Sequence, residues 1–206
     1  MFITFEGIDG SGKSTQLELL AKDLQQKGKK VLLTREPGGT SLAEGLRQIL
    51  LETSVAPATE LLLFGAARAQ HVAEVIQPAL AEGAIVLCDR FTDSTLAYQG
   101  GGLGLSTDFI QTMNSFACRE VSPDLTLLFD IDPLGGLKRQ QLNRQKPDAI
   151  ESRGLKFLER VRQAYLNIAH SNSERIVIIN AARDTYAVQC DVALALQQRG
   201  LIYTGQ

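Results

Sequence analysis

The N-terminal part of the chain contains a glycine-rich segment whose spacing suits the binding of phosphate groups. Residues 7–14 read Gly-Ile-Asp-Gly-Ser-Gly-Lys-Ser and match the pattern G-x-x-x-x-G-K-[ST] at every fixed position. Glycines let the backbone curl until successive N–H groups point inward, and the N-terminus of a following helix adds partial positive charge. Lys13 can reach the β- and γ-phosphates of a nucleoside triphosphate, and the hydroxyl of Ser14 can bind Mg²⁺. The segment therefore predicts a P-loop that binds a nucleoside triphosphate.

A second pair of chemically capable residues, Asp89 and Arg90, directly follows the apolar run at residues 84–88. An aspartate at the carboxyl end of a strand beside a P-loop can hold the water shell of Mg²⁺. An adjacent arginine can bind a second, acceptor phosphate through two N–H groups. The pair favours phosphoryl transfer to a phosphorylated acceptor.

Kinases, GTPases and ATP-driven motors all use a P-loop, so the motif leaves three classes of protein to separate. A GTPase would carry an N-K-x-D motif and a D-x-x-G motif after its second or third strand, and neither stands in a plausible place. A motor or transport ATPase would usually be longer than 206 residues. These observations favour a small kinase.

Five short apolar runs separated by helical patterns must position these residues. Such an alternation predicts an α/β fold with a five-stranded parallel sheet and helices on both faces. The expected strands are residues 2–5, 31–34, 84–88, 125–129 and 176–179, the last three as runs buried on both faces. The expected helices begin near Ser14, span about 41–51, extend from Pro57 towards Gly83, and span about 185–198.

The stretch 138–151 departs from this alternation, because it is polar and has few core-forming residues. It predicts a short mobile lid that extends from a single domain spanning residues 1–206. At roughly 100–200 residues per domain, the length of 206 residues agrees with one domain.

Composition and charge exclude several classes of partner. The net charge of −2 provides no positive field for nucleic acid, so phosphates must be held by locally placed groups. No window approaches 18 uninterrupted apolar residues, and the N-terminus has no signal-peptide pattern, so we expect no membrane span. The three cysteines, Cys88, Cys118 and Cys190, lack any paired spacing and predict reduced thiols in a cytoplasmic protein.

On these and further residues the chain resembles the thymidylate kinases of the bacterial type over nearly its whole length. The P-loop is shared by many unrelated proteins, whereas the later segments, in this order, are far more specific. The segments that carry the resemblance are residues 5–15, 34–40 (Thr-Arg-Glu-Pro-Gly-Gly-Thr), 60–64 with 68–71, 89–91 with Ser94 and 97–100, and 123–130.

The resemblance implies a P-loop nucleoside monophosphate kinase fold, a homodimer, and transfer of the γ-phosphoryl group of ATP to dTMP with Mg²⁺. Lys13, Asp89 and Arg90 would then be catalytic, and the metal would be held by Ser14, Asp89 and Asp9. The donor nucleotide would be bound by Gly7, Ile8, Asp9, Gly10, Ser11, Gly12, Lys13, Ser14 and Thr15.

The resemblance also implies how the acceptor base is bound. Phe64 would stack on thymine and Arg68 would hydrogen-bond its exocyclic O4, which rejects cytosine because the amino group would leave the arginine unpaired. Thr95 would contact the base, and Tyr98 would pack where a ribose 2′-hydroxyl would sit. The spacing of Phe64 and Arg68, four residues apart on one helix face, would equally suit a core phenylalanine and a solvated arginine.

At the phosphate end of the acceptor, Arg90 would bind the phosphate of dTMP, with Arg35 and Glu36 completing that part of the pocket. Asp9 would bind the 3′-hydroxyl of the sugar and help to place Mg²⁺. Pro37 stands where relatives have a strained turn, which a cis peptide bond would suit.

Members of the family differ in whether an extra cation comes from the P-loop or from the lid. Because Gly10, not arginine, precedes Ser11, the resemblance implies a lid-donated cation, with Arg144 as the first choice and Arg139 as the second. Lys146 and Arg153 are further basic residues of this region. Two positions depart from the family pattern: residues 148–151 read Asp-Ala-Ile-Glu without the arginine of many relatives, and Ala67 precedes Arg68 where an acid often stands.

Two other functions remain open from the residues. One is another small P-loop nucleotide or deoxynucleoside kinase with a different acceptor. The other is a non-enzymatic protein whose interactions depend on a bound nucleotide, against which the intact Lys13, Asp89 and Arg90 argue. His71 and His170 have no partners at metal-ligand spacing, which favours structural or surface roles.

Overall fold

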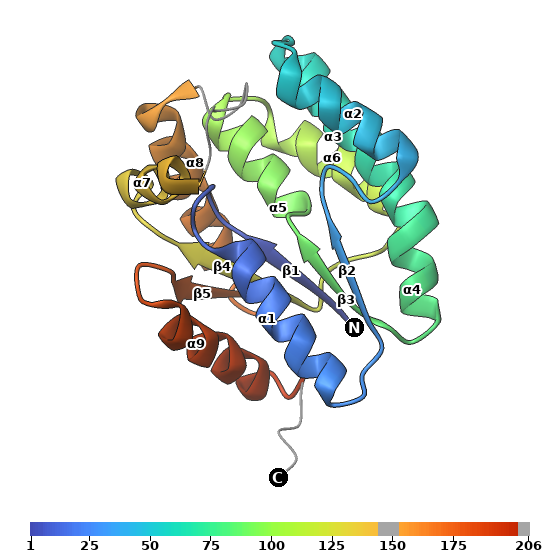
Figure 1. Ribbon diagram of the computed structural model, residues 1–206. Coiled ribbons are helices and arrows are strands. Elements are labelled where there is room, and N and C mark those ends of the chain that lie inside the picture. The colour runs from blue at the N-terminus through green and yellow to red at the C-terminus, as the bar shows by residue number, and fades with distance from the viewer. Residues whose placement is uncertain (144–152, 202–206) are drawn as a thin grey trace.

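A parallel sheet of five strands lies at the centre of the molecule (Figure 1). The computed structural model describes residues 1–143 and 153–201. The strands are hydrogen-bonded in the order β2-β3-β1-β4-β5. They are β1 (Phe2–Glu6), β2 (Val31–Arg35), β3 (Ile85–Asp89), β4 (Leu125–Asp130) and β5 (Ile176–Asn180). Each predicted apolar run is a strand, which confirms the α/β fold with five parallel strands.

The two predicted phosphate-binding motifs lie at the carboxyl edge of this sheet, because parallel strands all end on the same side. Strand β1 is central and pairs with β3 in a register that places Phe5 opposite Asp89. The chain leaves β1 at Glu6 to form the P-loop and leaves β3 at Asp89. The pairing of β1 with β3 therefore brings the two motifs together.

Helices cover both faces of the sheet, as the strand alternation requires. Ile3 and Phe5 belong to the core beneath α1 (Lys13–Gln26) and α9 (Thr185–Gln198), which pack against each other on one face. Phe2 packs with Val72 and Ile76 on the other face of the sheet. Helix α8 (Leu155–Ser171) also lies on that face (Figure 1). The remaining helices are α2 (Ser41–Glu52), α3 (Pro57–His71), α4 (Gln77–Ala81), α5 (Thr92–Thr95), α6 (Thr107–Cys118) and α7 (Pro133–Asn143), with π-helical segments at Val72–Ile76 and Leu96–Gly102.

The predicted helices are confirmed, and four helices had no prediction: α5, α6, α7 and α8. Of these, α8 buries Phe157, Val161 and Tyr165 at helical spacing. Residues 138–143, the first part of the predicted lid, form the end of α7, and residues 144–151 lie outside the described part of the chain. That this region moves as a lid stays a prediction.

One expectation about burial is wrong. Residues 176–179 were expected to form a strand buried on both faces, but Ile178 is 41% exposed. The reason is topological: β5 is an edge strand, so one of its sides has no neighbouring strand, whereas β3 and β4 have strands on both sides. Among the described residues, no helix combines the length and apolarity needed to cross a membrane.

Candidate functional site

The P-loop turns tightly before the N-terminus of α1, and two of its glycines adopt left-handed backbone conformations. Gly10 has φ 76° and Gly12 has φ 88°, which side chains with a Cβ rarely adopt. A Cβ on Gly10 would lie 2.2 Å from the carbonyl oxygen of Gly136 in α7, so this glycine is also required by close packing. The loop and the first residues of α1 line a cavity, and the N–H groups at the N-terminus of a helix can bind an anion.

Lys13, the first residue of α1, is buried and its Nζ donates to the carbonyl oxygen of Ile8 at 3.0 Å. Burial lowers the pKa of Lys13, and the positive charge of Arg90 lowers it further, while Asp89 and Asp9 oppose the change. An ammonium group held in this way gains from the arrival of an anion, because phosphate oxygens would compensate its loss of solvation.

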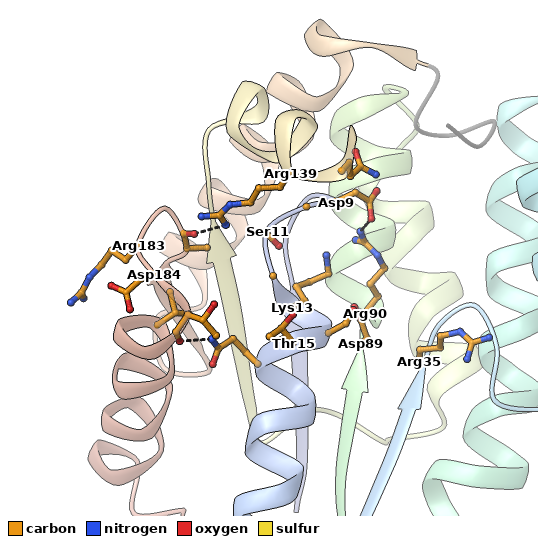
Figure 2. Close-up of a pocket in the computed structure, with 18 of the residues that line it drawn as sticks. Asp9, Ser11, Lys13, Thr15, Arg35, Asp89, Arg90, Arg139, Arg183 and Asp184 are labelled. Carbon is orange, nitrogen blue, oxygen red and sulfur yellow. Dashed lines mark hydrogen bonds and ion pairs between the residues drawn. The ribbon is translucent and has the colours of Figure 1, made fainter. Parts of the chain in front are cut away.

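A cavity of about 820 Å³ lies over the P-loop (Figure 2). Its walls come from the P-loop with the start of α1, the carboxyl ends of β2 and β3, Arg47 of α2, helix α7, and the loop that leads into α9 with the start of that helix. Figure 2 shows Arg139 of α7 on the side of this cavity nearest Arg183 and Asp184. Nη1 of Arg139 donates to the carbonyl oxygen of Ala181 at 2.8 Å, so α7 is tied to the loop before α9.

Ser14 and Asp89 form an oxygen-rich pair on the floor of this cavity. Oγ of Ser14 donates to Oδ2 of Asp89 at 2.7 Å, while Oδ1 of Asp89 is buried and has no hydrogen-bond partner among the described residues. Magnesium is usually bound through one or two carboxylates together with waters and substrate phosphates. The pair fits that donor set. In the described part of the chain no three His, Cys, Asp or Glu residues form a metal cluster of their own.

A smaller cavity of about 100 Å³ adjoins the large one on the side of α3 and α5. It is lined by Phe64, Thr95 and Tyr98, three residues predicted to bind the acceptor. Oγ1 of Thr95 is buried without a partner in the part of the chain that the structure describes, so it can bond to a bound molecule. The two cavities share Asp9, Glu36, Arg47 and Arg90.

Arg90 lies where the two cavities meet. Its Nη2 forms an ion pair with Oδ1 of Asp9 at 2.7 Å, and its Nη1 donates to the carbonyl oxygen of Gly7 at 3.0 Å. The guanidinium also lies over the ring of Tyr98, 5.0 Å from the ring centre. Arg90 has φ 72°, an unusual conformation for a residue with a side chain, and β1 holds it there because the backbone N–H of Arg90 donates to the carbonyl oxygen of Phe5.

Arg68 is buried at the base of the smaller cavity, with 1% of its surface exposed. Its Nε donates to Oε2 of Glu36 at 2.8 Å, and its other nitrogens donate to Asn114 and to the backbone of Phe91. Ala67 precedes Arg68 at the position where relatives often have an acidic residue. In this structure Glu36, from a different segment of the chain, supplies the carboxylate that pairs with Arg68. The reading of Arg68 as a solvated arginine is therefore wrong.

Glu6, directly before the P-loop motif, is a buried residue of this site to which the sequence analysis gave no role. It is fully buried, and its carboxylate accepts from the backbone N–H of Phe91 at 2.7 Å and the hydroxyls of Ser94 at 2.5 Å and Tyr165 at 2.9 Å. Burial raises the pKa of Glu6 to about 7, and the charge of Asp93 contributes. An acid at the end of an otherwise apolar strand was a signal for Glu6, whereas Tyr165 gave none beyond its helical spacing.

The structure places the other predicted residues unevenly around the two cavities. Pro37 follows a cis peptide bond and lines the smaller cavity. Arg35 is exposed on the rim of the larger one, where it pairs with Glu44 at 2.9 Å. Arg153 donates to the buried Glu60 and lies over the ring of Phe157, so it is held away from the P-loop.

Arg144 lies outside the described residues, as does Lys146. His71 is buried and lies 3.0 Å from Oε1 of Glu36, which agrees with a structural role.

Comparisons with known proteins all find similarity to one family. The family model described as thymidylate kinase matches residues 5–192. The thymidylate kinase of Pseudomonas entomophila is 53% identical over 192 residues, which cover 92% of this chain and 91% of that protein. The thymidylate kinase of Pelobacter propionicus is 46% identical, with 96% and 94% covered. The crystal structure of thymidylate kinase from Ehrlichia chaffeensis superposes with a TM-score of 0.80 at 39% identity, covering 96% of this chain and 98% of that one.

Proposed function

The chain belongs to the thymidylate kinase family, and from that premise we propose how its residues divide the work of the reaction. The enzyme transfers the γ-phosphoryl group of ATP to dTMP, which gives dTDP and ADP. The observation that carries the assignment of roles is the junction of the two cavities at Asp9 and Arg90. A donor bound over the P-loop and an acceptor bound beside Phe64 would have their phosphates meet at this junction.

The larger cavity is proposed as the ATP site. The N–H groups of residues 7–15 face the polyphosphate, and Lys13 neutralises the oxygens between the β- and γ-phosphates. The buried position of Lys13 supports this role, since its charge acts where water is excluded. Phosphoryl transfer needs little covalent chemistry from the protein, so positioning and charge neutralisation account for most of the rate.

The smaller cavity is proposed as the dTMP site. Phe64 stacks on the thymine, Arg68 donates to O4, and the free hydroxyl of Thr95 bonds to the base. Tyr98 occupies the space that a 2′-hydroxyl would need, which selects the deoxyribose. The buried contacts of Arg68 with Glu36 and Asn114 support this specificity, because they hold its donors in one geometry that a cytosine amino group cannot satisfy.

Arg90 and Asp9 are proposed to act at the phosphate end of the acceptor. Arg90 binds the phosphate of dTMP, and the hydrogen bond between the hydroxyl of Tyr98 and Asp9 places the carboxylate beside the sugar pocket, where it can bind the 3′-hydroxyl. Glu36 contacts both cavities and orients Arg68. Arg35, on the exposed rim, adds positive charge near the phosphates.

Ser14 and Asp89 are proposed to hold Mg²⁺, which when bound neutralises charge on the β- and γ-phosphates. The orphaned Oδ1 of Asp89 supports this assignment. Asp9 is paired with Arg90, so we propose that it contributes to the placement of the metal from a greater distance.

The extra cation is proposed to be Arg144, with Arg139 as the second choice. The side chain of Arg139 is bonded to Ala181 at the donor end of the larger cavity, which supports the preference for Arg144 at the point of transfer. We further propose one domain over residues 1–206 whose lid includes residues 138–151, acting in the cytoplasm, where the three cysteines stay free.

A homodimer is also proposed. Helices α3 and α6 pack side by side, and they leave three large apolar side chains exposed: Leu62 at 56%, Phe109 at 54% and Phe116 at 85%. Exposed apolar groups of this size mark interaction surfaces. A second copy of the chain that covers α3 and α6 would bury them.

A coupled assay of ADP release over a panel of nucleoside monophosphates tests the assignment of the acceptor site. We expect turnover of dTMP to exceed that of AMP, CMP and UMP by at least about a hundredfold in kcat/KM. The assignment of Phe64, Arg68 and Tyr98 would fail if their alanine variants changed the KM for ATP rather than the KM for dTMP.

A further inference from the structure

A buried group of hydroxyls connects helix α8 to the arginine at the junction of the two cavities. The hydroxyls of Ser94 and Tyr165 lie 2.8 Å apart, and Nη1 of Arg90 lies 3.3 Å from each of them. Both hydroxyls also lie within hydrogen-bond distance of Oε2 of Glu6. Tyr165 stands 75 residues after Arg90 in the chain, so only the packing of α8 makes this contact.

The chemistry of Glu6 determines the direction of these hydrogen bonds. When Glu6 is ionised, its carboxylate only accepts, so the hydroxyls of Ser94 and Tyr165 both donate to Oε2. The oxygen lone pairs of the two hydroxyls then face Arg90, whose N–H groups only donate. Burial and the neighbouring Glu6 raise the pKa of Tyr165, so its hydroxyl keeps the proton that this arrangement needs.

These contacts hold one terminal nitrogen of Arg90, Nη1, and leave the other, Nη2, directed at groups that line the cavities. Nη1 is held by Gly7, Ser94 and Tyr165, whereas Nη2 is directed at Asp9 and the hydroxyl of Tyr98. Because a guanidinium is planar and rigid, fixing Nη1 fixes the direction of Nη2. Of the two anchoring hydroxyl residues, Ser94 lines the smaller cavity and Tyr165 lines neither cavity.

The position of α8 is itself fixed by glycines in the segment that follows Ser94. A Cβ on Gly101 would lie 2.3 Å from Cβ of Ala164, and a Cβ on Gly102 would lie 2.5 Å from the ring of Phe157. The absence of these side chains lets α8 approach the π-helical segment Leu96–Gly102 closely enough for Tyr165 to reach Ser94. The tyrosine ring packs edge-on against Tyr98, with ring centres 6.2 Å apart.

We propose that Tyr165 is a positioning residue for the acceptor phosphate, which with Ser94 links Glu6 to Arg90 and holds the guanidinium towards the cavity junction. The inference rests on the role proposed above for Arg90. It assigns a function to a residue of α8 that lines neither cavity, and it predicts an effect on the acceptor rather than on the donor.

Steady-state kinetics of the full-length Tyr165→Phe variant tests the proposal, because this change removes one oxygen and keeps the ring. We expect the KM for dTMP to rise about tenfold while the KM for ATP stays within about twofold, as for the loss of a hydrogen bond to a charged group. Tyr186→Phe, which alters an exposed tyrosine of α9, is the matched control and should change neither constant.

Ser94 provides a rescue experiment. Ser94→Ala should raise the KM for dTMP as Tyr165→Phe does, Ser94→Thr should restore it, and the double variant should be less than additive because both hydroxyls act on one nitrogen. Thermal unfolding of each variant shows whether the fold is kept. A variant that loses stability but keeps the wild-type KM for dTMP, or that raises both KM values equally, would overturn the proposal.

Arg90→Lys separates this inference from the role of Arg90 itself. If Arg90→Lys leaves the KM for dTMP unchanged, the role of Arg90 at the acceptor phosphate is wrong. If Arg90→Lys raises it and Tyr165→Phe does not, Arg90 keeps its role and only the positioning by Tyr165 is rejected.

Discussion

Ser14 and Asp89 are 75 residues apart in the chain, and their side chains are joined by a hydrogen bond of 2.7 Å. Ser14 lies in the first turn of α1 and Asp89 is the last residue of β3, so the bond spans the two motifs that the sequence singled out. The second oxygen of Asp89 is buried without a partner among the described residues. A buried carboxylate oxygen is costly without a partner, and a cation that arrives with the nucleotide would compensate this cost.

Asp89→Asn should therefore weaken the use of Mg²⁺. The amide keeps the size of the side chain and removes the charge, so we expect kcat to fall by about a hundredfold and the Mg²⁺ concentration for half-maximal rate to rise. Initial rates over a magnesium titration measure both quantities. Removal of divalent cations with a chelator should abolish turnover of the wild type, and the same magnesium requirement in wild type and variant would contradict the assignment.

Arg68→Met should reduce both the specificity for dTMP and the free energy of unfolding. The methionine fills similar space but leaves Glu36 buried without its arginine, which costs about 3–5 kcal/mol of unfolding free energy. We expect kcat/KM for dTMP to fall by about a hundredfold, and the preference for dTMP over dCMP to narrow, because the donor to O4 is gone. The double variant Arg68→Met with Glu36→Gln should recover part of the stability without recovering the preference, as urea unfolding and the acceptor panel would show.

Glu6 should make catalysis depend on pH near neutrality. Its carboxylate must be ionised for Ser94 and Tyr165 to present their lone pairs to Arg90, so kcat/KM for dTMP should decline as the pH falls through about 7. The phosphate of dTMP titrates near pH 6 and contributes to any profile. Because that contribution is common to every variant, the difference between the profiles of the wild type and Glu6→Gln isolates Glu6; identical profiles would contradict the prediction.

Glu6 should also make the stability of the fold depend on pH, but its contribution to stability should fall as the pH rises. Its pKa is raised from 4.5 to about 7 in the folded protein, so the folded state binds the proton more tightly than the unfolded chain. The stability that Glu6 contributes is then fully present below pH 4.5 and is lost as the pH rises through about 7. Denaturant unfolding of the wild type and Glu6→Gln at a series of pH values should show the variant gaining relative stability towards alkaline pH.

Arg144→Ala should lower kcat more than it raises the KM for dTMP, because a cation that acts on the transferring phosphoryl group is felt mainly in the transition state. Arg139→Ala is the matched control from the same region. Since Arg139 is bonded to Ala181 near the donor end of the larger cavity, its loss should raise the KM for ATP instead. An unchanged kcat in the Arg144 variant would reject Arg144 as the cation.

Phe116→Asp should convert the proposed dimer into a monomer. Phe116 is the most exposed large apolar side chain of α6, and a carboxylate there would have to be desolvated in any interface. Sedimentation velocity of the wild type and the variant measures the change. A wild-type protein that sediments as a monomer would contradict the proposal before the variant is needed.

Much of the fold could be predicted from the sequence because the patterns that indicate strands and helices are local. Each of the five apolar runs became a strand and α9 formed over the predicted residues 185–198, because strand and helix periodicity are set by neighbours in the chain. The exposure of Ile178 was not readable, since being at the edge of a sheet depends on strand order. Helices α6 and α8 were missed although both bury residues at helical spacing: Ile110, Asn114 and Ala117 in α6, and Phe157, Val161 and Tyr165 in α8.

The sequence by itself determined the P-loop, the pairing of Asp89 with Arg90, and through the resemblance the family and its two substrates. These depend on short motifs in which spacing alone places the reacting groups. The tertiary structure decided which buried partners orient them: Glu36 beneath Arg68, and Glu6, Ser94 and Tyr165 behind Arg90. Such partners come from distant segments and are united by strand pairing and helix packing, so no spacing along the chain records them.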